Sequence, residues 1–414
     1  MREGYKKTEV GVIPDDWDLK TIDDVVFINP ESLNNATNKE LLINYIDIES
    51  VKTGKILGTK DYTFGEAPSR ARRIVKFDDV IVSTVRPNLK AVATVKENIE
   101  NLVCSTGFAV LRNKDNLCSK FLYQYALSDI FTSQLVNKTV GSNYPAVNTS
   151  DIKGTYIIVP PLKEQEKIAE ILSTVDSQID DTEKLIEKSN ELKKGLMKKL
   201  LTKGIGHSEF KKTEVGEIPF DWEIKTLESI ASVIDSLHET PKYIDNGISM
   251  IRVVDINGGY IQTTKTVKVS DETYKKFTRK YTPRKGDIIM SRVGSYGLVS
   301  YLRDNNKVCL GQNIVVINTD INKKFLFYAL SSQYIKNEID KVTVGSSQKS
   351  LSLANIKKLH IVLPTSSEQV NISNILESID KNIEEYINKL EELKYLKKGL
   401  MQQLLTGKIR VNNL

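Results

Sequence analysis

The sequence predicts an α+β fold in which two related globular domains are joined by two long helices that form a coiled coil. Three features of the 414 residues predict it: a repeat that spans half of the chain, short β-branched segments around an internal helical stretch, and two long segments with heptad spacing of apolar residues.

The repeat is visible at both ends of its unit. Residues 6–25 and 211–230 are identical at twelve of twenty positions, and residues 193–202 and 397–406 at eight of ten. The two offsets are 205 and 204 residues, so one unit is half of the chain. Residues 30–75 and 233–284 show no convincing relation. The frame is therefore duplicated while part of its contents has diverged, as expected if one scaffold presents two different surfaces.

Each copy opens with a Gly-x-Ile-Pro-x-x-Trp segment, which we expect to be a turn that buries Trp17 or Trp222. β-branched runs then predict short strands, and apolar periodicity predicts one internal helix in each copy. The predicted strands are 79–85, 91–95, 108–111 and 156–159, with counterparts at 288–293, 299–302, 314–317 and 360–363, and the predicted helices are 120–136 and 324–342. This mixture indicates an α+β domain in each copy.

A long helix is expected after Pro160-Pro161 and after Pro364, because proline fits a helix entrance and not its interior. Apolar residues alternate at spacings of three and four through 163–201 and 367–405, which is the pattern of a coiled-coil seam. Such a helix is roughly 58 Å long, too long to bury its apolar stripe on one small domain. The expected helix-pairing residues are Ile168, Leu172, Val175, Ile179, Ile186, Leu196, Leu200, Ile372, Leu376, Ile379, Ile383, Tyr386, Leu390, Leu393, Leu400 and Leu404.

An alternative for these helices is that each stripe packs only on its own domain. Gly195 and Gly399 interrupt the two helices at a cost of about 1 kcal/mol relative to alanine. They indicate either a close helix approach or bend, or a frayed C-terminal turn. The expected domain organisation is a first recognition domain, a first helix, a second recognition domain and a second helix, at residues 1–160, 161–205, 206–364 and 365–414.

Composition limits the classes of function. Three cysteines cannot form a disulfide framework, and three scattered histidines make a metal site improbable. Cys104 and Cys309 occupy matching apolar settings, so buried structural thiols are favoured over reactive ones. The N-terminal residues lack a signal-peptide core, and no run of eighteen apolar residues predicts a membrane span. We therefore expect a cytoplasmic protein without a membrane partner.

The formal charge of +6 is unevenly distributed. Residues 163–201 and 366–406 carry thirteen Lys and Arg against sixteen Asp and Glu, a net of −3, which leaves +9 for the remainder. A basic excess on paired domains is typical of a nucleic-acid-binding protein, although an acidic protein partner would fit it too.

The candidate DNA-binding residues lie in equivalent places of the two copies. Basic stretches precede the strands at Asp79 and Asp287, arginines follow those strands, and loops rich in donors and acceptors occur later. Arginine can bind guanine and Asn or Gln can bind adenine in the major groove. For any single residue a solvated surface role is an equal alternative. The candidates are Arg70, Arg72, Arg73, Arg86, Lys90, Asn143 and Tyr144 in the first copy and Arg279, Lys280, Arg284, Arg292, Tyr296, Ser347, Gln348 and Lys349 in the second. Although Arg86 and Arg292 are displaced by two residues in the alignment, they could share a strand face.

The ordered set of motifs resembles the specificity subunits of Type I restriction-modification systems. The resemblance rests on the Gly-x-Ile-Pro-x-x-Trp openings, on residues 160–172 (PPLKEQEKIAEIL) with a worn echo from Pro364, and on the Lys-Lys-Gly-Leu-Met-x-x-Leu-Leu-Thr endings. Together with the repeat, it covers the whole chain. The second helix entrance lacks the Pro-Pro-Leu form of the first.

This resemblance implies two pseudo-two-fold related target-recognition domains that are joined by two long antiparallel helices. Each domain is expected to recognise one half of a split, asymmetric target in double-stranded DNA. It also implies two modification (methyltransferase) subunits as partners, with ATP-dependent restriction subunits completing the complex. No cofactor is expected on this chain, since S-adenosylmethionine and ATP would be bound by the partners.

Rival functions leave little trace in the sequence. An adenine methyltransferase needs an Asn/Asp-Pro-Pro-Tyr-like motif, and an ATP-driven motor needs a phosphate-binding loop, and neither motif is present. We therefore expect a non-catalytic protein without a metal site. The subunit of a related bifunctional restriction system and a coiled-coil adaptor that does not bind DNA remain as alternatives.

Overall fold

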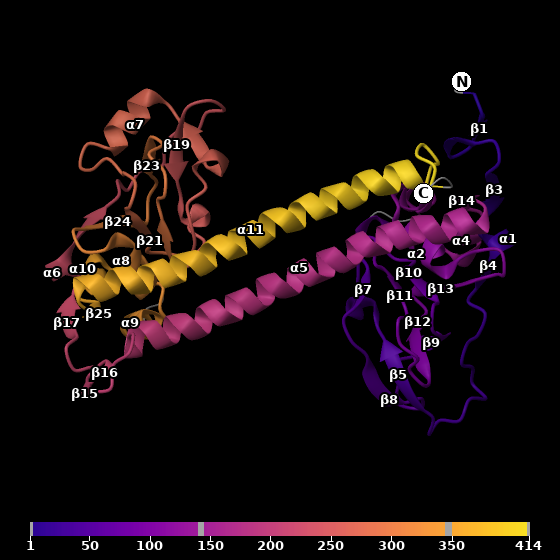
Figure 1. Cartoon of the computed structure of the whole chain (residues 1–414), viewed down its shortest axis with the longest axis horizontal. Coiled ribbons are helices and arrows are strands. Elements are labelled where there is room, and N and C mark those ends of the chain that lie inside the picture. The colour runs from indigo at the N-terminus through magenta and orange to yellow at the C-terminus, as the bar shows by residue number, and fades with distance from the viewer. Residues whose placement is uncertain (1–2, 140–144, 344–349, 412–414) are drawn as a thin grey trace. The chain divides into compact units, whose positions relative to one another are not determined.

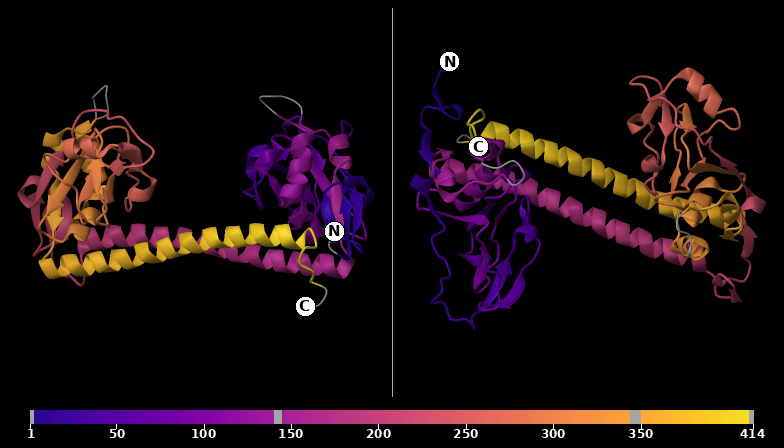
Figure 2. Two further views of the ribbon diagram at one scale, coloured as in Figure 1. Left: turned by 90° about the horizontal axis from the view of Figure 1, so that it is seen from above. Right: turned by 180° about the vertical axis from the view of Figure 1, so that it is seen from behind.

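The computed structural model describes residues 3–139, 145–343 and 350–411. The chain forms two compact units, which are described here one at a time (Figures 1 and 2). Unit 1 contains residues 1–183 and 388–414, and unit 2 contains residues 184–387. Unit 1 therefore holds one domain, the first part of the first long helix and the last part of the second. Unit 2 holds the other domain and the remaining parts of both helices.

Unit 1 opens with a hairpin and contains two four-stranded sheets. One sheet has the order β11-β10-β13-β4 and is antiparallel throughout, and the other has the order β8-β5-β12-β9, in which β5 and β12 are parallel. The strands are β1 (Tyr5–Thr8), β2 (Gly11–Pro14), β3 (Asp18–Thr21), β4 (Val26–Ile28), β5 (Leu42–Ile46), β6 (Val51–Lys52), β7 (Lys55–Ile56), β8 (Lys60–Thr63), β9 (Ala71–Ile74), β10 (Val80–Ser83), β11 (Val92–Thr94), β12 (Leu102–Ser105), β13 (Phe108–Asn113) and β14 (Tyr156–Val159). The helices of its domain are α1 (Ile22–Val25), α2 (Ser119–Leu127), α3 (Asp129–Asn137) and α4 (Thr149–Lys153), with 3-10 turns at Ile48–Ser50 and Pro87–Leu89.

Unit 2 repeats this frame with different contents in the divergent region. Its antiparallel sheet has the order β18-β24-β21-β22, and its second sheet has three strands, β20-β19-β23, with β19 and β23 parallel. The strands are β15 (Phe210–Thr213), β16 (Gly216–Pro219), β17 (Glu223–Thr226), β18 (Ala231–Asp235), β19 (Ile248–Ile251), β20 (Val267–Val269), β21 (Ile288–Ser291), β22 (Val299–Tyr301), β23 (Val308–Leu310), β24 (Ile314–Thr319) and β25 (His360–Leu363). Its helices are α6 (Leu227–Ile230), α7 (Asp271–Phe277), α8 (Lys323–Leu330), α9 (Gln333–Thr343) and α10 (Leu353–Lys357), with 3-10 turns at Val253–Asp255 and Thr263–Lys265. The α+β prediction is confirmed in both units.

The predicted helical stretch is confirmed in both copies, but it is not one continuous helix, because two helices occupy each segment. Between α2 and α3, Ser128 adopts an extended backbone conformation and its hydroxyl accepts a hydrogen bond from the amide of Phe131 at 3.2 Å. Between α8 and α9, the hydroxyl of Ser332 likewise accepts from the amide of Ile335. Serine caps of this kind start a new helix, and apolar periodicity alone does not reveal them.

The two tryptophans are fully buried, as predicted, but the residues before them form more than a turn. The Gly-x-Ile-Pro segments are β2 and β16, the second strands of two hairpins. Trp17 and Trp222 each belong to the main core cluster of their unit. Cys104 and Cys309 are also fully buried, and this burial raises the pKa of each thiol to about 12. The sulfur atoms therefore have the inert character expected of structural cysteines.

The two long helices are α5 (Leu162–Lys203) and α11 (Ser366–Leu404), and they begin directly after the predicted prolines. They run antiparallel within each unit: Lys397 pairs with Asp176 at 2.5 Å in unit 1, and Lys193 pairs with Asp380 at 2.6 Å in unit 2. All sixteen predicted helix-pairing residues are buried or half-buried.

The outer ends of the apolar stripes enter the domain cores, so the alternative of packing on the domains holds in part. Ile168, Leu172 and Leu404 join the core of unit 1, and Leu200, Ile372 and Leu376 join that of unit 2. The predicted close approach at the two helix glycines is wrong. A methyl group added at Gly195 or Gly399 would meet nothing within 4 Å, and both residues lie inside their helices.

Candidate nucleic-acid interface

In unit 1, Arg86 lies where three segments meet. Strand β10 ends at Ser83, Val85 pairs with Ala146 in an isolated bridge, and the amide of Arg86 donates to the carbonyl of Pro145 at 2.7 Å. The exposed Arg86 therefore lies beside Pro145 and Ala146. The predicted strand 79–85 is too long, and Arg86 has a left-handed backbone conformation with φ of 50°. The shared strand face expected for Arg86 and Arg292 is thus wrong, since Arg86 is not in a strand.

Unit 2 repeats this arrangement at Arg292. Strand β21 ends at Ser291, Val293 pairs with Ser350, and the amide of Leu351 donates to the carbonyl of Arg292 at 2.8 Å. The side chain of Arg292 makes more hydrogen bonds within the unit than expected for a residue that is free to contact DNA. The guanidinium donates to both carboxylate oxygens of Asp235 at 2.8 and 2.9 Å and to the carbonyl of Leu351 at 3.1 Å. Arg292 therefore ties the end of β18 at Asp235 to Leu351.

The basic stretch 70–73 is divided by the pleat of β9. Arg70 is exposed, and Arg72 stacks over the ring of Phe64 at 4.6 Å. Arg73 points inward, where its guanidinium donates to the carbonyl of Phe108 and to the side-chain oxygen of Asn29. Burial lowers the pKa of Arg73 from its ordinary value. Arg70 and Arg72 are therefore accessible from outside, whereas Arg73 fastens the two sheets of the domain.

The basic stretch of unit 2 surrounds a small pocket. Exposed Arg279 and Lys280 line a cavity of about 260 Å³ together with Ser236, whose buried hydroxyl has no hydrogen-bond partner among the described residues. Arg284 is also exposed, and its guanidinium donates to the hydroxyl of Tyr281 at 3.2 Å. These three basic residues thus lie on the outside of the domain, as a phosphate-binding surface requires.

The remaining predicted residues differ in their placement. Lys90 donates to Asp129 at 2.6 Å and to the carbonyl of Leu127. Tyr296 is partly buried against the core of unit 2, and its hydroxyl reaches Asp340 at 3.5 Å. The predicted contacts at Asn143, Tyr144, Ser347, Gln348 and Lys349 lie outside the described residues.

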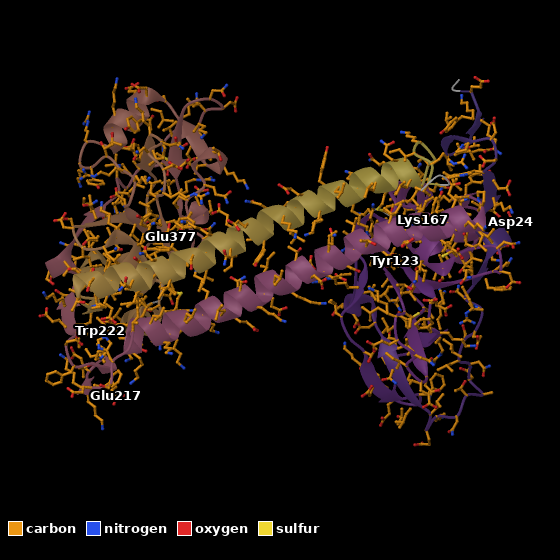
Figure 3. The ribbon with its side chains drawn as sticks, viewed as in Figure 1. Asp24, Tyr123, Lys167, Glu217, Trp222 and Glu377 are labelled. Carbon is orange, nitrogen blue, oxygen red and sulfur yellow. The ribbon has the colours of Figure 1, made fainter. Side chains whose placement is uncertain are left out.

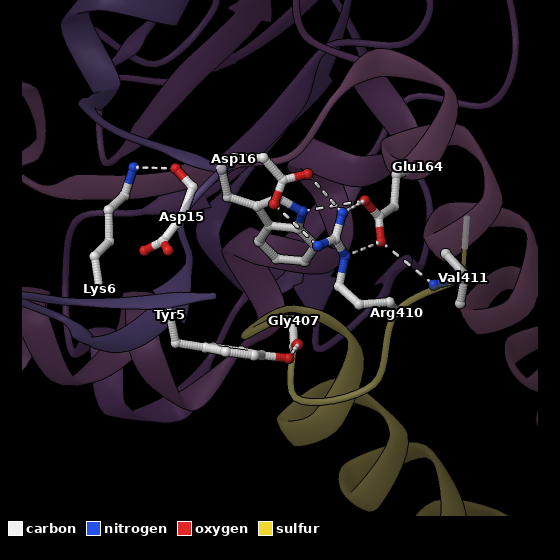
Figure 4. A network of polar contacts seen from close by, with 9 residues as sticks. Tyr5, Lys6, Asp15, Asp16, Glu164, Gly407, Arg410 and Val411 are labelled. Atoms are coloured by element: carbon white, nitrogen blue, oxygen red, sulfur yellow. Dashed lines mark hydrogen bonds and ion pairs between the residues drawn. The ribbon is translucent and has the colours of Figure 1, made fainter. Parts of the chain in front are cut away.

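The sequence did not reveal a polar network that, in each unit, joins the start of one long helix to the segment after the other. We call this network the closure of the unit. In unit 1, Glu164 accepts hydrogen bonds from Trp17, from the guanidinium of Arg410 at 2.8 and 2.9 Å and from the amide of Val411 (Figure 4). Asp16 holds the other side of that guanidinium at 2.8 and 2.9 Å. Burial would raise the pKa of Glu164, but the hydrogen bonds from Arg410 and Trp17 hold it below its ordinary value.

Unit 2 builds the equivalent closure with a histidine. Glu368 accepts from Trp222 at 2.8 Å and from the amide of Ile205 at 2.9 Å, and it lies 2.9 Å from the Nε2 atom of His207. The Nδ1 atom of His207 lies 3.4 Å from Asp221. The imidazole therefore bridges two carboxylates, as Arg410 does in unit 1. His207, Asp221 and Glu368 each offer one potential metal-ligand atom, and these atoms lie within 4.8 Å of one another. The sequence signal that could have revealed both networks is the repetition of Trp17 and Glu164 as Trp222 and Glu368.

No helix within the described ranges is long and apolar enough to cross a membrane.

Known proteins resemble this chain over its full length. The profile of the family described as "Type I restriction modification DNA specificity domain" matches residues 14–194 and 219–395. The Type I restriction enzyme MjaVIII specificity subunit of Methanocaldococcus jannaschii is 30% identical over 425 aligned residues, which cover 100% of this chain and 97% of the relative. The EcoBI specificity subunit of Escherichia coli is 26% identical over 73% of this chain and 64% of its own length.

Solved structures show the same fold. The S subunit of a Type I restriction-modification system from M. genitalium superimposes with a TM-score of 0.60 at 16% identity, covering 94% of this chain and 96% of the other. A chain from a structural study of complex assembly and conformational transition in a type I R-M system gives a TM-score of 0.58 at 23% identity, covering 96% and 99%.

Proposed function

Because the chain belongs to the family of Type I restriction-modification specificity subunits, we propose that each of its two units recognises one half of a split DNA target. One observation carries this proposal: both units place an arginine shortly after the equivalent strand, where it is hydrogen-bonded to Pro145 in unit 1 and to Leu351 in unit 2. A duplicated frame with matching arginine positions suits two similar but non-identical half-sites. An asymmetric target is the expected result.

The divergent sheets support different specificities for the two units. Unit 1 builds its second sheet from four strands, whereas unit 2 uses three strands and adds α7. The accessible basic residues differ accordingly, with exposed Arg70 and half-buried Arg72 in unit 1 and exposed Arg279, Lys280 and Arg284 in unit 2. Base-specific hydrogen bonds depend on such local geometry, so two different base sequences are expected.

We propose that the chain itself is non-catalytic and acts through two modification subunits, with ATP-dependent restriction subunits completing the complex. S-adenosylmethionine and ATP would then be bound by those partners and not by this chain. The long helices supply a docking surface for them, since α5 exposes Leu192 to 55% and α11 exposes Tyr395 to 82%. Large apolar side chains on an exposed helix face are typical of a protein interface.

Methylation mapping tests this function directly. The chain is coexpressed with its cognate modification subunits, and methylated adenines are located by sequencing the host DNA. We expect one asymmetric motif made of two short parts separated by a spacer without sequence preference. Methylation by the modification subunits at the same sites without this chain would contradict the proposal.

A further inference from the structure

Unit 1 contains a groove of about 1780 Å³ between its domain and the two long helices. The domain side is formed by residues around β6 and β7, by the turn 86–90 and by α2, whose Tyr123 is labelled beside α5 in Figure 3. The helix side is formed by residues 173–183 of α5 and residues 394–408 at the end of α11. The last helix of the chain therefore forms one wall of a groove on the first domain.

The groove carries an excess of positive charge. Its lining has ten basic side chains against six acidic ones, a net of +4. Four lysines already pair with four of the acidic groups: Lys55 with Asp180 and Glu183, Lys394 with Glu183, Lys90 with Asp129 and Lys397 with Asp176. Four further lysines are exposed and make no side-chain hydrogen bond or ion pair with a residue that the structure describes: Lys52, Lys96, Lys120 and Lys398.

Apolar side chains lie among these lysines. Leu57, Phe77 and Leu89 line the groove and are 57%, 54% and 60% exposed. Leu89 projects from a turn whose two ends, Arg86 and Lys90, both have left-handed backbone conformations with φ of 50°. Such conformations cost about 1–3 kcal/mol each in residues other than glycine and concentrate at functional sites.

We propose that this groove binds the phosphodiester backbone of double-stranded DNA, with Lys52, Lys96, Lys120 and Lys398 as phosphate contacts. The proposal rests on the function proposed above and adds that α11 takes part in DNA binding by the first domain. Lysines on flexible stems suit phosphates, which require charge more than a fixed bonding pattern. DNA is favoured over an acidic protein because Arg86, the arginine on which the proposed DNA recognition by unit 1 rests, lines the same groove.

Two lysines on one helix give a matched test. Lys398→Gln removes a charge from the groove, and Lys389→Gln removes one from an exposed position of α11 outside it. Each variant is assembled with the modification subunits, and its affinity for a random-sequence duplex is measured across a range of salt concentrations. Loss of one phosphate contact reduces the slope of log affinity against log salt by about 0.9, which corresponds to about eightfold weaker binding in about 0.1 M salt.

We expect this loss for Lys398→Gln and for Lys52→Gln, on opposite walls of the groove, and no change for Lys389→Gln. Melting temperatures and the stoichiometry of the assembled complex serve as controls. If the lysine variants bind DNA with the same slope as Lys389→Gln, or if they lose modification subunits and not DNA affinity, the groove proposal is overturned while the proposed function stands. If the unaltered complex binds no duplex in a salt-dependent manner, the proposed function itself fails.

Discussion

A fragment that ends at His207 is expected to form a two-fold symmetric dimer. In the full chain, the segment after α11 closes unit 1 at Trp17 and Glu164, and the segment after α5 closes unit 2 at Trp222 and Glu368. The fragment keeps the Trp17 and Glu164 site and the segment after α5, but it has lost the partner of each. Two copies that pair their helices antiparallel restore both closures, each copy supplying the segment that the other lacks.

The structure gives the scale of this association. Leu200 and Leu201 of one copy would take the places of Leu404 and Leu405, all four of which are buried in the full chain. Burial of each leucine contributes about 1.5–3 kcal/mol, so two closures contribute about 6–12 kcal/mol. Association costs about 4–15 kcal/mol, and the closures alone roughly balance this cost. Burial of Val175, Ile179 and Ile186 along the helices adds further favourable free energy of association. We therefore expect a dissociation constant in the micromolar range, which corresponds to a binding free energy of about −8 kcal/mol.

Light scattering over a range of concentrations measures the dimer. Gly204→Val should leave the fragment monomeric, because Gly204 has a φ of +64° and a Cβ atom there would lie 2.5 Å from Glu368 and 2.7 Å from Trp222 in the full chain. Gly195→Ala is the matched control: Gly195 lies in open space within α5, nine positions before Gly204, so the variant gains about 1 kcal/mol of helix propensity and should dimerise normally. A folded fragment that stays monomeric at every concentration, or a Gly204→Val fragment that dimerises as well as the parent, would refute this reasoning.

Three further predictions concern single side chains in the full chain. Arg292→Ala removes the bidentate partner of Asp235, which among the described residues keeps only His238, in a site where the side chains of Arg292 and Asp235 are less than 20% exposed, so thermal unfolding should show unit 2 destabilised by about 1–3 kcal/mol, with DNA binding weakened as well; Arg72→Ala should weaken DNA binding alone, and equal stability of the two variants would contradict this. The pKa of Glu164 is below its ordinary value of 4.5, so its carboxylate stabilises the fold above that pH and the contribution is lost as the pH falls through the lowered pKa; urea unfolding of Glu164→Gln should therefore show a weaker pH dependence below about pH 4.5 than the parent protein. A maleimide probe should label only the half-buried Cys118 in the native protein, since Cys104 and Cys309 are buried and their pKa is about 12; rapid labelling of three thiols would count against that packing.

The features that the sequence could predict are those encoded by repetition and period. The identical ends of the two copies revealed the duplication. Heptad spacing over 163–201 and 367–405 placed the ends of α5 and α11 within two residues of their positions in the structure. The burial of Trp17, Trp222 and the two apolar cysteines followed from their matching positions. Each of these depends on local pattern, which survives without knowledge of the tertiary fold.

The features that escaped prediction depend on residues far apart in the chain. Glu164 and Arg410 are separated by 246 positions, and no spacing rule connects them. The sequence suggested that Arg73 and Arg292 were free basic residues, but both guanidinium groups are hydrogen-bonded inside their domains. The groove lysines were missed for the same reason, since Lys52 and Lys398 come from opposite ends of the chain and meet only in the folded unit.

The central claim is that each unit recognises its own half of the target, and a domain exchange tests it most directly. Residues 211–363 are replaced by a second copy of residues 6–159, because both segments begin with Lys-Lys-Thr-Glu-Val-Gly and end with the strand that precedes a long helix. This chain is coexpressed with the modification subunits, and methylated sites are sequenced. If each unit recognises its own half-site, the asymmetric motif is replaced by a palindrome made of the first half-site and its inverted repeat. Methylation that continues at the original asymmetric motif would contradict this claim.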